Sequence, residues 1–119
     1  MLFQGFKNFA LAAAALCLSF QTFATNCPQA LPASDIGFCA SFQQVAQCHC
    51  QASGLPARMC NNVSMVYKRM ISTFGSIERA CQFQKDTTYE ICIQDWRCYQ
   101  EGGLTDEGQL CNATGLACQ

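Results

Sequence analysis

A Cys-His-Cys triplet at residues 48–50 is the feature of this sequence whose residue types most readily suggest chemistry. Two thiolates and an imidazole are ligands that zinc and copper take. On an α-helix, however, Cys48 and Cys50 differ by about 200° around the axis, so their side chains point to opposite faces and cannot close on one ion. A Cys-x-Cys pair can also be redox active, but the chain lacks the alternating strands and helices of a thioredoxin-like fold. We therefore predict no metal site and no cofactor.

His49 is the single histidine of the sequence, so any hydrolase site with a catalytic histidine would have to use it. Small secreted phospholipases pair a histidine with an adjacent aspartate, whereas His49 is followed by Cys50. The Gly-x-Ser-x-Gly elbow of serine hydrolases does not occur in the sequence. Glu90 and Asp95 fall in the first half of one predicted helix, where solvated carboxylates interact favourably with the helix dipole and need no catalytic role. We therefore predict no catalytic residue.

The first 24 residues have the organisation of a secretory signal peptide. Lys7 precedes an apolar run over residues 9–20, which is shorter than the roughly 20 residues that a membrane-spanning helix needs. Small residues follow at the positions that a signal peptidase reads, and we place the cut after Ala24. The sequence therefore predicts a cleaved signal peptide over 1–24 and one cysteine-rich domain over 25–119. Such a protein is secreted or periplasmic, and no integral membrane segment is expected after cleavage.

Ten of the 11 cysteines lie in the predicted mature domain. An even number at this density in an exported chain indicates five disulfides, which a small core needs for stability. The ten are Cys27, Cys39, Cys48, Cys50, Cys60, Cys81, Cys92, Cys98, Cys111 and Cys118.

Pairing of these cysteines is predicted from the turns between helices. Partners in a helical hairpin lie at similar distances from its turn, so we expect three local pairs. They are Cys48–Cys60, Cys81–Cys92 and Cys98–Cys111. The remaining four cysteines would form two long-range bridges that tie the extended N-terminal segment and the tail onto the first helix. These four are Cys27, Cys39, Cys50 and Cys118.

Apolar residues recur with helical periodicity, which predicts a mainly α fold. We expect a small disulfide-stapled bundle of three to four short helices with irregular N- and C-terminal segments. Ser34 and Asp35 can cap a first helix that ends near Ala52. Phe38, Phe42, Val45, Ala46 and His49 fall on the apolar face of this helix.

The later helices are bounded by residues with known terminal preferences. Pro56 suits the first position of a second helix, which Gly75 ends. Ser76 can start a short third helix. The spacing of Thr87 and Glu90 predicts a capping box for a fourth helix, which Gly102 and Gly103 stop. The tail from residue 104 contains several turn-forming residues and is expected to be irregular.

Net charge excludes one class of partner. The sequence has 7 Lys and Arg against 8 Asp and Glu, and Lys68-Arg69 is its one pair of adjacent basic residues. Without a basic patch to neutralise phosphates, nucleic acid binding is not expected. Asn62 and Asn112 both fit the acceptor pattern for N-linked glycans, which would be used in a eukaryotic host and would be a chance match in a bacterium.

Four aromatic residues on the predicted helices either form the core or line an apolar cavity: Tyr67, Phe74, Trp96 and Tyr99.

The sequence is compatible with three kinds of function. The sequence favours a non-enzymatic binding or effector protein whose partner is another protein, because a disulfide-fixed surface loses little entropy on docking. The first alternative is a carrier of a small apolar ligand such as a lipid. The second alternative is a small secreted enzyme with an unrecognised site.

Overall fold

The computed structural model describes residues 27–118, which lie within the predicted mature domain. The predicted signal peptide lies outside the described residues, and its cleavage stays a prediction. The described chain is mainly helical, as the apolar periodicity predicts. Its elements are α2 (Phe38–Ala52), α3 (Ala57–Cys60), α4 (Val63–Phe74), α5 (Ile77–Gln82), α6 (Tyr89–Glu101) and the 3₁₀ turn η1 (Cys111–Ala113). Within residues 27–118, every helix is too short or too polar to cross a bilayer.

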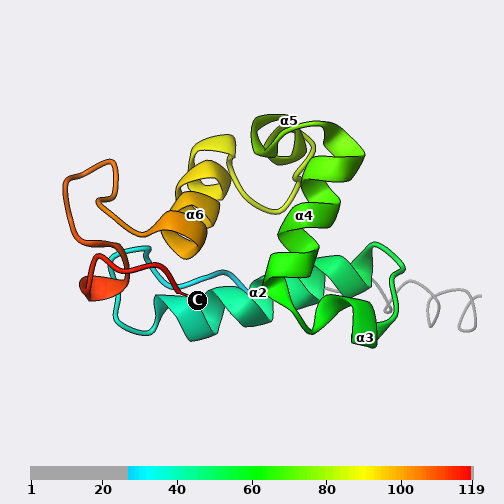
Figure 1. Ribbon diagram of the computed structural model, residues 1–119, viewed down its shortest axis with the longest axis horizontal. Coiled ribbons are helices and arrows are strands. Elements are labelled where there is room, and N and C mark those ends of the chain that lie inside the picture. The colour runs from blue at the N-terminus through cyan, green and yellow to red at the C-terminus, as the bar shows by residue number, and fades with distance from the viewer. Residues whose placement is uncertain (1–26, 119) are drawn as a thin grey trace, which may run out of the picture.

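Helix α2 forms the base of the molecule, and α4 and α6 both stand on one side of it (Figure 1). The extended N-terminal segment runs beside α2, and α5 joins the far ends of α4 and α6. The tail returns to α2, where Cys118 is bonded to Cys39. The arrangement leaves three helices facing a common interior.

The start of α2 differs from the prediction. The helix begins at Phe38, and neither Ser34 nor Asp35 caps it. Instead, the Asp35 carboxylate accepts a hydrogen bond from the Gly37 N–H at 2.7 Å, which makes a turn before the helix. Gly37 occupies the N-cap position without a side-chain hydrogen bond. The Asp35 side chain therefore stabilises a turn before the helix instead of capping the helix itself.

The predicted second helix is two helices, α3 and α4. The break falls at Asn62, whose backbone is extended and whose side-chain oxygen accepts a hydrogen bond from the Met65 N–H at 3.3 Å. This side chain caps α4, so the helical hydrogen-bond ladder restarts there. The predicted end at Gly75 is confirmed, because this residue is left-handed with φ 90° and donates its N–H to the Ile71 carbonyl.

The predicted start of α5 is confirmed, whereas the predicted start of α6 is wrong by one residue. Ser76 caps α5 as expected, and its hydroxyl accepts a hydrogen bond from the Arg79 N–H at 3.2 Å. The capping box expected at Thr87 is wrong, since Thr88 caps α6 and accepts from the Ile91 N–H. The shift by one residue leaves Thr87 free to face the interior between the helices.

Five disulfides join the ten cysteines of the described chain. The predicted pairs Cys81–Cys92 and Cys98–Cys111 are confirmed, and the predicted pair Cys48–Cys60 is wrong. The other three bridges are Cys27–Cys48, Cys39–Cys118 and Cys50–Cys60. Cys50 shares the buried face of α2, which points toward α3, whereas Cys48 lies about 200° away and reaches the N-terminal segment. Two bridges therefore attach the N-terminal segment and the tail to α2, as expected, but Cys48 takes the place predicted for Cys50.

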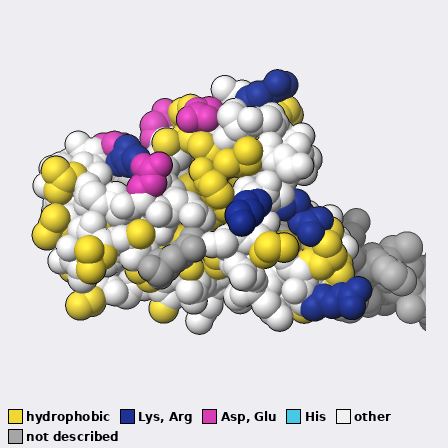
Figure 2. Space-filling model, viewed as in Figure 1, with side chains coloured by type: hydrophobic (Ala, Val, Ile, Leu, Met, Phe, Trp, Pro, Cys, Tyr) yellow, Lys and Arg dark blue, Asp and Glu magenta, His cyan; other side chains and the backbone are white. Residues whose placement is uncertain are grey.

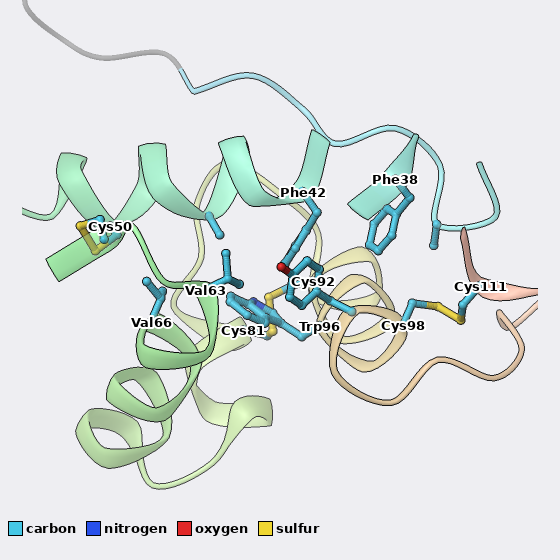
Figure 3. Close-up of a cluster of buried hydrophobic side chains, with 14 residues drawn as sticks. Phe38, Phe42, Cys50, Val63, Val66, Cys81, Cys92, Trp96, Cys98 and Cys111 are labelled. Atoms are coloured by element: carbon cyan, nitrogen blue, oxygen red, sulfur yellow. A yellow bond between two sulfur atoms is a disulfide. The ribbon is translucent and has the colours of Figure 1, made fainter. Parts of the chain in front are cut away.

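The core lies where α2 meets α4 and α6 (Figure 3). Buried residues of α2 recur every four positions, at Phe38, Phe42, Ala46 and Cys50. The Phe42 ring contacts the Trp96 ring edge-on, with centroids 4.8 Å apart, and lies 5.2 Å from the Tyr99 ring. These contacts fix α6 against α2 and place Trp96 at the centre of the interior.

Candidate ligand-binding site

A cavity of about 660 Å³ lies between α2, α4 and α6. The N-terminal segment 27–34 and the segment 83–88 before α6 complete its walls. Figure 2 shows hydrophobic side chains in a recess between α4 and α6, where the interior reaches the surface. The cavity is partly open to solvent, as binding clefts are, and is not a closed void in the core.

Apolar side chains from all three helices form the main wall. Phe42 comes from α2, Val66, Met70 and Phe74 come from α4, and Trp96 comes from α6. On α4 these residues follow one another at intervals of four, so one stripe of the helix faces the cavity. The helix periodicity that builds the core thus also builds the cavity.

The four aromatic residues predicted for a cavity divide into two groups. Phe74 and Trp96 line it directly. Tyr67 packs behind, with its ring centroid 5.4 Å from that of Trp96. Tyr99 packs against Phe42, and its hydroxyl accepts a hydrogen bond from the Gln43 side chain at 2.8 Å. The two tyrosines therefore support the lining residues and do not form the wall themselves.

Asp95 on α6 also lines the cavity, and the interpretation of this residue as solvated is wrong. It is 8% exposed, and its burial raises the pKa of the carboxyl from 3.8 to about 7. Within residues 27–118 its side chain has no hydrogen bond or ion pair. The sequence pattern indicates this burial, because one helix face has the spacing of Cys92, Asp95, Trp96 and Tyr99.

Other charged groups line the cavity around this carboxyl. Arg69 on α4 has a buried Nε atom that finds no hydrogen-bond partner in the described chain. His49 on α2 lies with its Nδ1 3.5 Å from an Asp86 carboxylate oxygen. Glu107 comes from the loop after α6. The apolar wall therefore carries a few polar groups, which is the usual composition of a small-molecule site.

The loop after α6 is held in place beside Asp95 by hydrogen bonds. The Gln94 side chain accepts from the Asp106 N–H at 2.8 Å, and Arg97 donates to the Asp106 carboxylate at 3.2 Å. Thr105 is buried, lines the cavity and accepts a hydrogen bond from the Gln109 N–H. These contacts give the cavity a fixed polar border on this side.

The three side chains of the Cys-His-Cys triplet point in different directions and have different partners. Cys48 and Cys50 each belong to a separate disulfide, and His49 faces the cavity between them. Within residues 27–118, no three His, Cys, Asp or Glu side chains lie close enough to share a metal ion. Of this triplet, Cys50 lines the cavity as part of a disulfide, and His49 brings an imidazole with an acidic neighbour.

The two glycan acceptor motifs have structural roles in the fold. Asn62 caps α4, as described above. Asn112 is buried, donates its side-chain N–H to the Leu116 carbonyl and accepts a hydrogen bond from the Thr114 hydroxyl. These contacts hold the tail in its compact form, and a glycan on Asn112 would disrupt them.

No protein-family model matches this chain, and no curated protein or solved structure matches it significantly. The function is therefore inferred from the site itself.

Proposed function

We propose that this protein is an exported, non-enzymatic carrier that binds a small, largely apolar ligand in the cavity between α2, α4 and α6. The single observation that carries this proposal is the cavity, with about 660 Å³ of space and an apolar wall. This volume falls within the range of about 300 to 1,000 Å³ that small-molecule sites occupy. The disulfide-rich helical scaffold is of the kind found in oxidising, extracytoplasmic compartments.

Three disulfides support the walls of the cavity. Cys27, Cys50 and Cys92 line it, and their bridges attach the N-terminal segment to α2, α2 to α3, and α5 to α6. The Cys27–Cys48 bridge joins two wall elements, and the other two bridges fix α2 and α6 to the neighbouring helices α3 and α5. All three oppose collapse of the interior when no ligand is present. A preformed site of this kind loses little conformational entropy on binding, so contact with an apolar chain is sufficient for affinity.

The sequence alone favours a protein partner over a small ligand. Rigidity serves either function, but rigidity does not require an internal cavity. The cavity therefore supports a ligand carrier more than it supports a protein-binding scaffold. A specific protein partner is the alternative outcome of the experiments below.

The proposal is tested with the neutral apolar dye N-phenyl-1-naphthylamine, whose fluorescence rises in an apolar site. We expect saturable binding of the dye to the disulfide-intact protein and loss of binding after reduction. Extraction of protein purified natively from the exported fraction, followed by mass spectrometry, should release an apolar molecule. Absence of dye binding and of any extracted molecule would overturn the proposal.

Two neighbouring positions on α4 supply a matched control for the dye experiment. Both are exposed, but Thr73 lies at the edge of the cavity and belongs to its lining, whereas Ser72 does not. Thr73→Trp should fill part of the cavity and weaken dye binding, while Ser72→Trp should leave it unchanged. Equal effects of the two substitutions would place the dye elsewhere on the surface.

A further inference from the structure

Asp95 is a buried acid in a cavity wall, and the described chain gives it no partner. Its residue exposure is 8%, and no hydrogen bond or ion pair of residues 27–118 involves its side chain. Burying an unpaired carboxylate is unfavourable, and most buried charges are paired. The same face of α6 places Trp96 in the apolar wall beside it. A ligand in contact with Trp96 therefore lies close to an acidic group that has no partner within the described chain.

The charges that face the cavity are mainly acidic. Asp86, Asp95 and Glu107 line it, against one guanidinium, that of Arg69. The imidazole of His49 is beside the Asp86 carboxylate. Figure 2 shows the Asp and Glu side chains of this face gathered mainly over α6, while Lys and Arg lie mainly toward the helices α3 to α5. This distribution favours a positive group on the α6 side of the ligand.

We propose that the ligand is a cationic amphiphile, an apolar chain or ring system with a protonated amine that pairs with Asp95. This inference rests on the proposed carrier function and names the chemical class of its ligand. The ammonium group supplies up to three N–H donors, and a charge-assisted hydrogen bond to a carboxylate is stronger than a neutral one. The apolar part then lies against Phe42, Phe74 and Trp96.

Pairing with the amine also resolves the unfavourable burial of the acid. In the absence of ligand, burial raises the pKa of Asp95 to about 7, so the carboxyl is held partly protonated at neutral pH. A cation in contact with the carboxylate stabilises the ionised form. Arg69 lies on α4, on the wall opposite the helix that carries Asp95, and its buried Nε is the group that would instead favour an anionic ligand.

Three ligands of equal chain length distinguish these possibilities: dodecylamine, dodecan-1-ol and dodecanoate. Each displaces N-phenyl-1-naphthylamine from the disulfide-intact protein in a titration at pH 7.5. We expect dodecylamine to bind about tenfold more tightly than dodecan-1-ol, from one charge-assisted hydrogen bond. Dodecanoate should bind most weakly. A preference for dodecanoate would assign recognition to Arg69 and overturn the proposal.

Two substitutions on α6 show whether Asp95 is the group responsible. Asp95→Asn keeps the side-chain size and should reduce the amine-to-alcohol ratio to about one. Glu90→Gln removes the same charge from an exposed position outside the cavity and should leave the ratio unchanged. Equal loss in both variants would indicate a general charge effect and refute the role of Asp95.

If none of the three ligands displaces the dye, the carrier function itself fails. If all three bind equally, the carrier function stands and the amine preference is wrong.

Discussion

Replacing Asp95 by asparagine should stabilise the protein at pH 8, because the substitution removes a buried charge. Burial raises the pKa of this carboxyl from 3.8 to about 7 in the folded state. Each pKa unit corresponds to about 1.4 kcal/mol, so a rise from 3.8 to about 7 destabilises the folded protein with ionised Asp95 by at most about 4 kcal/mol. The folded protein favours the neutral acid. The folded state therefore has its full stability below about pH 4 and loses stability as the pH rises through about 7.

Asparagine is neutral at every pH and nearly the same size, so the variant should lack this loss. Chemical denaturation with the disulfides intact, measured at pH 4, 6 and 8, gives the free energy of unfolding for both proteins. We expect similar values at pH 4 and an advantage for Asp95→Asn that grows to as much as about 4 kcal/mol at pH 8. Glu90→Gln serves as the exposed control and should show no such growth with pH. Parallel pH profiles for wild type and Asp95→Asn would refute the burial of this acid.

Two further predictions test the core and the corrected disulfide. Phe38→Ala should lower the free energy of unfolding by about 3 to 5 kcal/mol, because the Phe38 side chain is fully buried and its removal leaves a cavity. The control Ile36→Ala, at a position that is 79% exposed, should change the free energy of unfolding by less than about 0.5 kcal/mol. Non-reducing peptide mapping, with the chain cut between the two neighbouring cysteines of α2, should find Cys60 joined to Cys50. A peptide that joins Cys60 to Cys48 would contradict the structure.

Helix ends were predictable wherever one residue has a strong preference and no competitor nearby. Gly75 adopts a left-handed conformation that other residues avoid, and Ser76 offers a hydroxyl for the next cap. Prediction failed where several candidates stood together. Thr87 and Thr88 are chemically equivalent caps, and the fold uses the second. The break at Asn62 was not predicted because the apolar spacing in the sequence continues from Met59 through Val63 and Val66 without interruption.

The disulfide error has a simple geometric cause. Distance from a turn does not distinguish Cys48 from Cys50, since both are near the end of the same helix. Helical phase does distinguish them, because Cys50 continues the four-residue series of Phe38, Phe42 and Ala46 on the buried face. Applying that series to the pairing would have selected Cys50 as the partner of Cys60.

The candidate site was partly predictable. Phe74 and Trp96 occupy apolar stripes, which predicted either a core or a cavity position for them, and both line the cavity. The size of the cavity depends on the relative positions of α2, α4 and α6, which no local pattern determines. Asp95 was missed because its proximity to the start of α6 suggested a dipole contact, although its spacing from Cys92 and Tyr99 indicated the buried face.

The central claim, that the cavity binds an apolar ligand, is tested most directly by the fluorescence of Trp96. This residue is the one tryptophan of the sequence and lines the cavity, so its emission reports on the site alone. Bromine quenches tryptophan at short range, and 12-bromododecan-1-ol can be compared with dodecan-1-ol, which has the same chain without bromine. We predict saturable quenching by the brominated ligand, with one molecule bound per chain, and reversal of quenching on addition of dodecan-1-ol. Emission that stays constant, or quenching that rises linearly without saturation, would contradict the account.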